Sequence, residues 1–477
     1  MSATIFTIKR SEIEGRLDPL FYKAVLRIEK EIISHSKYDV FKVRDVCSIT
    51  RGRFGHRPRN DPAYYGGKYP FIQTGDIVKA SDFDTEIEFS QTLNELGLST
   101  SRLFKSPKLL FTIAANIGDT AILTYDSCFP DSIVALDVNE NITNIDYLNI
   151  YFKILKPYIY DLAPFSAQRN LNNKQLEEIP LIIPPILVQQ KIIDIYRTVQ
   201  IERREKYKQA KHLLDSIDSY LLDELGIKLP QKDNSLSKRI FTTKFSEVSG
   251  GRWDPKFYST EAKSIKNAVE NSKYNTKVLE EFIVQSVAGD WGYEEDENIP
   301  NTTKCLVIRS TEFDNDYNLK LDNTRAKYRL IPNLKLKKID LRENDLLIEK
   351  SGGSEDQPVG RIAILTKDIL ESATLCFSNF IHKIRVHDID AEYLFCFLKT
   401  AHNIKLTETM FAQTNGLQNL IMQTYFNQKI PLPPLPKQKE IASHIREIRE
   451  QAKQLQVEAE QTMQEAKKQI EKMILGE

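Results

Sequence analysis

The chain has 477 residues and carries 66 basic and 66 acidic side chains, so its formal net charge is zero. This balance excludes a protein that coats nucleic acid through a strong overall positive field, although local basic surfaces remain compatible with it. Hydrophobic residues make up 41% of the chain and aromatic residues 9%, which is enough to build folded cores. The length predicts two to four domains.

Membrane and metal signals are weak throughout the chain. The longest apolar run, 179–188, is interrupted by Pro184 and Pro185 and is shorter than the roughly 18 residues of a membrane span. The N-terminal residues lack the apolar core of a secretory signal. The five cysteines form no CxxC pair, so neither a disulfide framework nor a metal site is predicted. These patterns predict a cytoplasmic protein.

Two sequence motifs occur twice, in the same order. RLDPLFY at 16–22 returns as RWDPKFY at 252–258, and IPLIIPPILVQQKII at 179–193 returns as IPLPPLPKQKEIA at 430–442. Both double-proline motifs run into a long, charged, proline-free stretch. Such repeats predict two similar globular regions, each followed by a helix.

The first globular region, 1–186, contains short β-type runs between turns rich in Gly and Pro. They are followed by a helical pattern over 145–162, where Pro157 is expected to break the helix. The second region, 237–435, repeats this order: DLLIEKSGG corresponds to KLLFTIAANIG, VGRIAIL to IGDTAIL, and AEYLFCFLK to DYLNIYFK. The sequence therefore predicts an α+β fold class with two tandem α/β domains.

The segments 187–236 and 436–477 are predicted to be long helices. Apolar or small residues recur in steps of three and four from Lys191 to Leu225 and from Glu440 onwards, which is typical of a coiled-coil seam. Arg203 and Lys206 interrupt the first stripe, and Pro185 and Pro436 suit helix entry. We expect the two helices to pair antiparallel; the alternative is that each folds back on its own domain. The predicted seam residues are Ile192, Tyr196, Val199, Leu213, Ile217, Ile441, Ile445, Ile448 and Leu455.

Catalytic motifs are not recognisable. The chain has no GxxxxGK[ST] phosphate loop, no strand-borne GxGxxG and no nucleophile constellation. Glu349 lies beside Lys350, but this spacing is wrong for a metal-dependent nuclease. We therefore predict a binding protein without catalytic or metal-ligating residues.

Basic residues gather in two places. The segment 51–59 holds four arginines and no acid, and the segment 324–342 holds seven basic residues against Asp340. A charge run alone most often marks a solvated surface. Here each run falls in the part of a separate repeat where the sequence differs between the two copies, which favours a binding role.

The double-proline motif followed by a heptad helix, present twice, resembles the specificity (DNA-recognition) subunit of type I restriction–modification enzymes. The pieces RLDPLFY, RWDPKFY, LLIEKSGG and QRNLNNKQLEEIPL support the resemblance, which covers essentially the whole chain. It implies that 1–186 and 237–435 are target-recognition domains, each reading one half of a split, asymmetric DNA sequence. The helices 187–236 and 436–477 would then be spacers that set the distance between the half-sites.

The resemblance also implies the partners. Subunits of this kind carry no catalytic residues and bind no cofactor. They dock two modification (methyltransferase) subunits, which bring S-adenosylmethionine and methylate adenine. Restriction (motor-nuclease) subunits that use ATP and Mg are further candidate partners, together with double-stranded DNA.

Side chains that donate hydrogen bonds or carry positive charge are the candidates for DNA contact, since bases are read in the major groove and phosphates fix the register. Ordinary turn chemistry is the alternative role for each of them. The candidates in the first region are Arg51, Arg53, Arg57, Arg59, Gln168, Arg169 and Asn170. Those in the second region are Lys350, Ser351, Gly352, Gly353, Ser354, Arg361, Thr414 and Asn415.

Three other functions stay open at this point. The chain could be a recognition subunit of another methylation or phage-defence assembly. It could be an enzyme with a divergent methyltransferase or nuclease site, which would have to bind a cofactor by itself. It could also be a coiled-coil scaffold without a DNA role, which salt-dependent duplex binding would exclude. The bases recognised and the spacer length cannot be predicted from one sequence.

Overall fold

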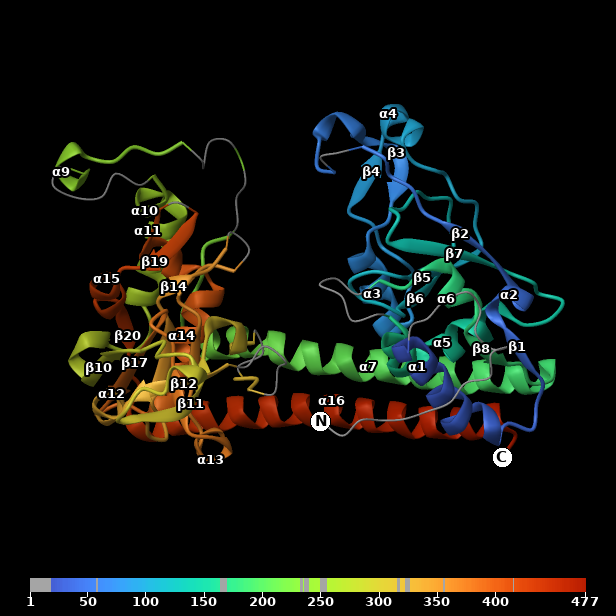
Figure 1. The fold of residues 1–477 in the computed structure, drawn as a ribbon. Coiled ribbons are helices and arrows are strands. Elements are labelled where there is room, and N and C mark those ends of the chain that lie inside the picture. Colours follow the sequence, from blue (N-terminus) through green and yellow to red (C-terminus); the bar gives the residue numbers. More distant parts are fainter. Residues whose placement is uncertain are drawn as a thin grey trace. The chain divides into compact units, whose positions relative to one another are not determined.

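The structure is a computed structural model of the chain (Figure 1). It describes residues 19–56, 59–163, 170–231, 235, 240–248, 255–314, 318–321, 327–354, 357–414 and 416–477. The chain divides into two compact units. Unit 1 consists of Met1–Gln209 and Gln454–Glu477, and unit 2 consists of Ala210–Lys453.

Unit 1 is built on an antiparallel four-stranded sheet. Its strand order is β2 (Cys47–Arg51), β7 (Ile133–Val138), β5 (Lys108–Thr112) and β6 (Thr120–Leu123). Successive side chains of β5 point to opposite faces. Leu109 and Phe111 pack in one apolar cluster with α5 (Ile145–Leu162), while Leu110 packs in another with residues of α3 (Thr74–Phe83). Both faces are covered, which explains why three apolar residues, LLF, follow one another in β5.

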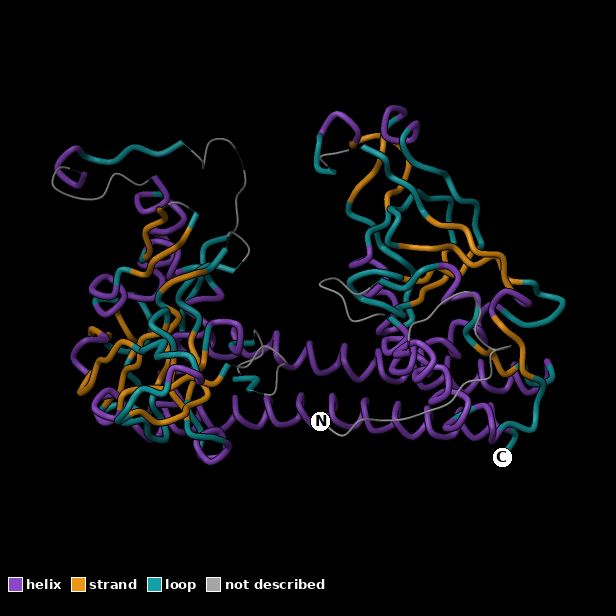
Figure 2. Tube along the Cα trace, viewed as in Figure 1, coloured by secondary structure: helices purple, strands orange, loops and turns teal. Residues whose placement is uncertain are grey.

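Unit 2 repeats this topology. Its sheet has the order β10 (Ile283–Ala288), β17 (Ile381–Val386), β13 (Leu346–Glu349) and β15 (Ile362–Ile364), and α14 (Ala391–Asn403) takes the place of α5. Leu346 and Ile348 pack in the cluster that contains α14, whereas Leu347 packs on the other face. The predicted correspondences between the two regions are therefore confirmed. Figure 2 shows that each unit combines strands and helices.

Each unit adds a second, smaller sheet. In unit 1, β3 (Tyr65–Phe71) pairs with β4 (Gln91–Leu93), and the short helix α4 (Glu95–Ser99) follows. In unit 2, β11 (Thr302–Ile308) pairs with β12 (Tyr328–Pro332), and α12 (Asn333–Ile339) follows. The remaining main elements are α1 (Pro19–Glu31), β1 (Val40–Lys42), α6 (Asn173–Glu177), β8 (Pro180–Ile182), α11 (Thr260–Glu270), β9 (Thr276–Val278), β14 (Ser351–Gly352), α13 (Lys367–Ser372), β16 (Leu375–Phe377), β18 (Phe411–Thr414), β19 (Leu417–Leu420), α15 (Met422–Phe426) and β20 (Lys429–Pro431).

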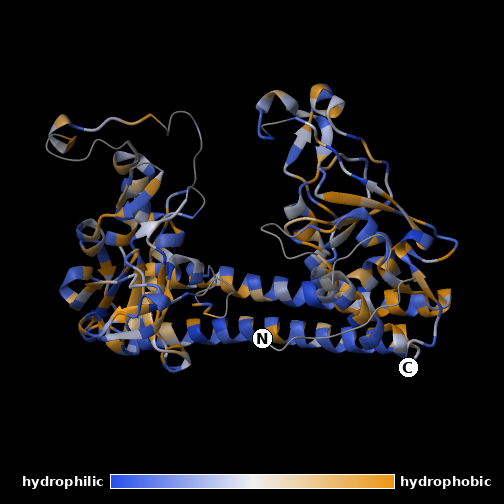
Figure 3. Cartoon of the chain, in the orientation of Figure 1, coloured by the Kyte–Doolittle hydropathy of each residue, from blue (hydrophilic) through white to orange (hydrophobic). Residues whose placement is uncertain are grey.

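The two predicted long helices are α7 (Ile186–Leu225) and α16 (Leu435–Leu475). Their apolar stripes alternate with polar residues in Figure 3. In unit 1, Arg203 pairs with Glu460 and Lys206 with Glu458; in unit 2, the ring of Tyr220 contacts that of His444 and Glu224 pairs with Lys437. Numbers rise along one helix as they fall along the other, so the pairing is antiparallel in each unit.

The predicted seam residues lie in these contacts. Ile192 and Tyr196 are buried in the core of unit 1, and Ile217, Ile441, Ile445 and Ile448 in that of unit 2. Val199 and Leu213 pack against the same cores, and Leu455 is half-buried. The predicted coiled-coil pairing is confirmed. The helices also form part of each domain core, as the alternative had it.

The double-proline motif has a structural reason to occur twice. Gln189, five residues after Pro184, donates to the Pro184 carbonyl at 2.8 Å and accepts from the backbone N–H of Asn144, the N-cap of α5, at 2.9 Å. Gln438 does the same for Pro433 and for Asp390, the N-cap of α14, at 2.8 Å each. Each buried amide thereby ties the start of a long helix to the helix that covers the sheet.

The expectation that Pro157 breaks a helix was wrong. Helix α5 continues through Pro157 to Leu162, because Ile159 and Leu162 are buried against the core beyond the proline. Helix α7 ends at Leu225, where the predicted apolar stripe also ends. Gly226 has φ +66°, and the Ile227 N–H donates to the Leu222 carbonyl at 2.8 Å, which closes the helix with a glycine C-terminal motif.

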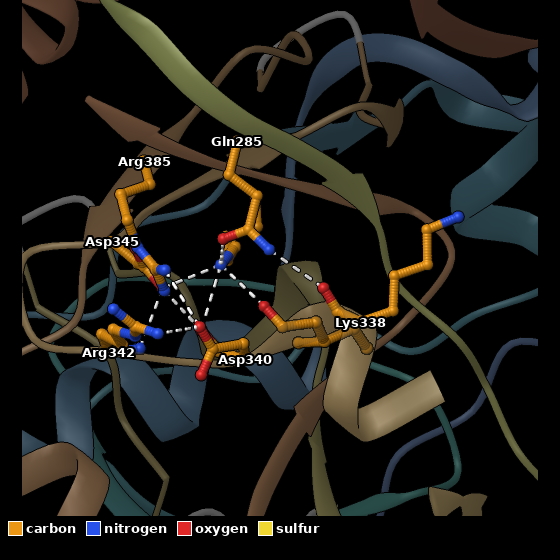
Figure 4. A network of polar contacts seen from close by, with 8 residues as sticks. Gln285, Lys338, Asp340, Arg342, Asp345 and Arg385 are labelled. Carbon is orange, nitrogen blue, oxygen red and sulfur yellow. Dashed lines mark hydrogen bonds and ion pairs between the residues drawn. The ribbon is translucent and has the colours of Figure 1, made fainter. Parts of the chain in front are cut away.

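A buried ionic network anchors α12 to the sheet of unit 2 (Figure 4). Lys383 on β17 and Asp345 have fully buried side chains, and Lys383 Nζ lies 3.0 Å from Asp345 Oδ2. Lys383 also donates to Gln285 Oε1 and to the Ile339 carbonyl, both at 2.7 Å. Arg385 Nε donates to Asp345 Oδ1 at 2.7 Å. Removing one charge would leave its partner buried without full compensation.

We therefore expect Lys383→Met to lower the free energy of unfolding of unit 2 by about 3 kcal/mol, measured by urea denaturation. The matched control is Lys367→Met, since Lys367 is 72% exposed and pairs with the exposed Glu371 on the same helix. The control should change stability by less than about 0.5 kcal/mol. Equal effects of the two substitutions would contradict a structural role for the network.

Candidate nucleic-acid interface

Those predicted DNA-contact residues of unit 1 that the structure describes gather at one edge of its main sheet. Strands β2 and β5 are both antiparallel to β7, so they run parallel to each other and end at the same edge. Arg51 at the end of β2 is opposite Val134, and Thr112 at the end of β5 is opposite Ile133. The loops that follow these two strands therefore emerge together.

Two arginines of the first loop, 51–59, converge on Asp131. Arg51 Nε donates to the Asp131 carbonyl at 2.6 Å, and an Nη atom of Arg59 lies 2.6 Å from Asp131 Oδ1. Arg53 is exposed and belongs to the same loop. Arg57 lies outside the described residues. Three predicted arginines thus form one exposed basic loop in which Asp131 orients two of them.

The basic loop is held in place by a small apolar core. Phe54 is buried with Phe71, Leu93 and Cys128, and its ring centroid lies 5.0 Å from that of Phe71. A Cβ on Gly52 would come within 2.3 Å of the Pro130 carbonyl oxygen, so only glycine fits there. The loop backbone is therefore packed against the domain while its guanidinium groups reach solvent.

Asn170 lies at the same sheet edge as the basic loop. It is exposed and forms a β-bridge with Ala114, and the next residue, Leu171, donates its N–H to the Ile113 carbonyl at 2.8 Å. Gln168 and Arg169 lie outside the described residues. The structure thus brings Asn170 to the loop that follows β5.

The corresponding edge of unit 2 carries the residues 350–354. The N–H groups of Lys350 and Ser351 donate to the Phe380 carbonyl at 2.8 and 3.1 Å. Gly352 and Gly353 have φ +118° and +62°, values that favour glycine. Lys350 is half-buried, Ser351 is buried and Ser354 is exposed. Of these five residues, Lys350 and Ser354 are the ones whose side chains can meet a ligand.

His382, next to this edge, adds no positive charge. Burial lowers the pKa of His382 to about 4, and the charge of Lys350 acts in the same direction. The Ser286 hydroxyl lies 2.7 Å from His382 Nε2. The imidazole is therefore neutral near pH 7.

A hairpin of β18 and β19 closes this loop. Ser351 and Gly352 form β14, which pairs with Asn419 and Gln418 of β19. The buried Gln418 donates to the Ser354 carbonyl and accepts from the Val359 N–H, both at 3.1 Å. Thr414 ends β18 at the turn of the hairpin, and Asn415 lies outside the described residues. Thr414 therefore lies in the hairpin whose strand β19 pairs with residues 351–352 of this loop.

Arg361 forms an internal ion pair in unit 2. Its guanidinium makes two hydrogen bonds with the Glu349 carboxylate, at 2.8 and 2.9 Å, and donates to the carbonyls of Ser310 and Phe313. Both side chains are buried, and burial raises the pKa of Glu349 while Arg361 opposes that rise. The contact of Arg361 with DNA stays a prediction.

Sequence reasoning missed Asp131, which organises the basic loop from 72 residues away from Arg59. A single aspartate at the end of a loop carries no motif, so no signal in the sequence singles it out. The partnership arises only because the start of β7 meets the ends of β2 and β5 at one edge.

The family of the chain follows from a match to a sequence family described as type I restriction modification DNA specificity domain. The match covers residues 35–211 and again 283–461, which is more than half of the chain. The chain therefore belongs to this family of DNA-recognition subunits. The two matched segments correspond to the two repeats that the sequence motifs predicted.

Three solved structures match the chain along most of its length at low sequence identity. The S subunit of a type I restriction-modification system from M. genitalium is 12% identical, covers 92% of this chain and 96% of its own, and has a TM-score of 0.41. A structure described as the basis of complex assembly and conformational transition of the type I R-M system is 14% identical, with coverages of 92% and 96% and a TM-score of 0.47. The HsdS subunit from Thermoanaerobacter tengcongensis is 14% identical, with coverages of 92% and 95% and a TM-score of 0.31.

Across the described ranges of the chain, no helix combines the length and the apolar character needed to span a bilayer.

The basic loop supplies a direct prediction. We expect Arg51→Gln with Arg53→Gln to weaken duplex binding and to reduce the slope of log K against log salt by about 2, because each lost phosphate contact retains about one counterion. The measurement is a fluorescence anisotropy titration of a mixed-sequence DNA duplex at several salt concentrations.

The matched control for this prediction is Lys30→Gln with Lys79→Gln, two exposed lysines of unit 1 outside the loop. It removes the same net charge and should leave the slope within about 1 of the original. Equal slopes for the two double variants would show that the loop acts only through the net charge of the protein. Thermal unfolding of both variants checks that the domain remains folded.

Proposed function

We propose that this chain is the specificity subunit of a restriction–modification assembly that recognises a bipartite, asymmetric DNA target and directs adenine methylation to it. The observation that carries the proposal is the presence of two DNA specificity domains in one chain, at 35–211 and 283–461. Two different domains of one fold would read two different half-sites, and so the complete target is asymmetric.

The geometry of the two units supports this function. In each unit the variable loops sit on the edge of a sheet whose faces are both packed, so these loops are the part that can diverge without loss of the core. Exposed arginine and amide side chains at such an edge suit phosphate contact and base reading. The long helices would set the spacing between half-sites, as dimer geometry does in other DNA-binding proteins.

Partner subunits supply the chemistry in this proposal. The chain acts as a non-catalytic platform for two modification subunits, which use S-adenosylmethionine, and for restriction subunits that use ATP and Mg. One of the solved structures that match this chain is described as the structural basis of complex assembly of the type I R-M system. The exposed polar faces of α7 and α16 offer extended surfaces for partner helices.

The deciding experiment maps methylated adenines in DNA exposed to the modification subunit with and without this chain. We expect one split motif, two short half-sites at a fixed spacing, that is methylated only when the chain is present. Addition of a restriction subunit with ATP should then produce cleavage of unmethylated DNA that contains this motif.

Two other results would point elsewhere. Methylation that is the same with and without the chain would sink the specificity role. If the chain in addition showed no salt-dependent binding to any duplex, a coiled-coil scaffold without a DNA role would explain the fold better. Chain-dependent methylation without cleavage would indicate a methylation assembly that lacks a restriction motor.

A further inference from the structure

The basic loop of unit 1 has a structural counterpart in unit 2, the loop 288–297. Gly289 occupies the position of Gly52, since a Cβ there would come within 2.2 Å of the Phe377 carbonyl oxygen. The N–H of Arg53 donates to the Phe129 carbonyl at 3.0 Å, and that of Asp290 donates to the Phe377 carbonyl at 2.8 Å. Both loops follow the first strand of the main sheet, so they are the same element in two copies.

The charge of this loop is reversed between the two copies. RGRFGHRPR at 51–59 contains four arginines and no acid, whereas AGDWGYEEDE at 288–297 contains five acids and no base. Two of these acids are engaged inside unit 2: Glu294 pairs with Arg329, which stacks 4.7 Å from the Trp291 ring, and Glu295 Oε2 lies 2.7 Å from Lys304 Nζ. A loop of this charge repels phosphate.

The short helix that follows the second sheet also differs in charge between the units, but here the helix of unit 2 is the basic one. In unit 1, α4 has the sequence ELGLS, and its charged residue Glu95 pairs with Lys68. In unit 2, α12 has the sequence NLKLKKI, which carries three lysines and no acid. A cluster of basic residues therefore lies near the second sheet of each unit. In unit 1 it is on the loop 51–59, and in unit 2 it is on α12.

The lysines of α12 are available for a ligand. Lys337 and Lys338 are exposed and Lys335 is half-buried. Within the described part of the chain, no hydrogen bond or ion pair engages their ammonium groups. Leu334 on the same helix is 82% exposed, so neighbouring structure leaves this surface open.

The helix that carries these lysines is fixed at its C-terminal end. The carbonyls of Lys338, Ile339 and Asp340 accept hydrogen bonds from Gln285, Lys383 and Arg385 (Figure 4). Carbonyls at a helix end have no intrahelical partner, and cations there also offset the helix dipole. The Lys338 side chain extends away from this network in Figure 4. A basic surface is thus presented on a rigid support.

We propose that the two units contact the DNA backbone through different elements: unit 1 through Arg51, Arg53 and Arg59 of the basic loop, and unit 2 through Lys335, Lys337 and Lys338 of α12. The acidic loop 288–297 stays off the backbone. This inference rests on the proposed function in DNA recognition. It assigns a nucleic-acid contact to a helix whose counterpart in unit 1, α4, has no basic residue.

The test compares triple variants of the full chain in titrations of a mixed-sequence DNA duplex between about 50 and 200 mM salt. Replacing Lys335, Lys337 and Lys338 with Gln should weaken binding and reduce the slope of log K against log salt by about 2 to 3, because roughly 0.9 counterion is released per phosphate contact. Asp296→Asn with Glu297→Gln should leave the slope unchanged and should not weaken binding.

The matched control replaces Lys266, Lys367 and Lys405 with Gln. These exposed lysines of unit 2 each pair with an acid on the same element, so the variant removes the same charge from other surfaces. Replacement of the three α12 lysines with Arg keeps the charge and should restore the slope. Failure of this rescue would mean that the loss comes from structure and not from phosphate contact.

The outcomes separate this inference from the proposed function. If the unaltered chain shows no salt-dependent duplex binding, the DNA role itself fails. If it binds and the α12 variant matches the control, the DNA role stands and α12 is not a backbone contact. Weaker binding on neutralisation of Asp296 and Glu297 would overturn the assignment of the acidic loop.

Discussion

Each unit depends on the antiparallel pairing of α7 with α16, because neither apolar core closes without sections of both helices. In unit 1, Ile192 and Tyr196 of α7 and Ile470 and Ile474 of α16 share a cluster with β5 and α5. In unit 2, Ile217 and Leu221 meet Ile441 and Ile445 in the cluster that holds β13 and α14. Most of the stability of a helix in a protein comes from the packing of its apolar face and not from helix propensity. The seam between α7 and α16 therefore contributes to the folding of each unit, in addition to its proposed role in spacing the half-sites.

The repeat extends to the helix ends, where small local motifs join each helix to a domain. The Lys37 N–H donates to the Leu475 carbonyl at 3.0 Å, and the Lys273 N–H donates to the Leu225 carbonyl at 2.9 Å. A glycine with positive φ follows each helix, at Gly476 and Gly226. Each of these lysines lies in a Ser-Lys-Tyr triplet, and the two triplets are separated by the same 236 residues as the Arg16 and Arg252 motifs. This shorter repeat is visible in the sequence and supports the same alignment of the two repeats.

The fold could be predicted further than the site, for reasons that particular residues make clear. Consecutive apolar residues, as in KLLFT and DLLIE, indicate a strand that is packed on both faces. An apolar stripe such as Ile441, Ile445 and Ile448 indicates that the helix packs against another element. Whether an arginine can contact DNA depends on whether its charged group is buried or exposed in the folded domain. Arg361 and Arg51 are alike in sequence, yet one is buried against Glu349 and the other is exposed beside Asp131. Pro157 shows the converse, since tertiary packing of Ile159 and Leu162 outweighs a local helix breaker.

The two units differ most where their structure constrains them least. Gly52 and Gly289 cannot change without a collision with backbone oxygens, and Gln189 and Gln438 each join two helix starts, so these positions keep their residue type. Side chains that leave the same loops can even change sign, as in 51–59 and 288–297, because their contacts lie outside the core. A phosphate backbone demands positive charge near it but not on a given element. The fold can therefore move that charge from a loop to α12, provided that the buried Lys383–Asp345 pair keeps the helix in place.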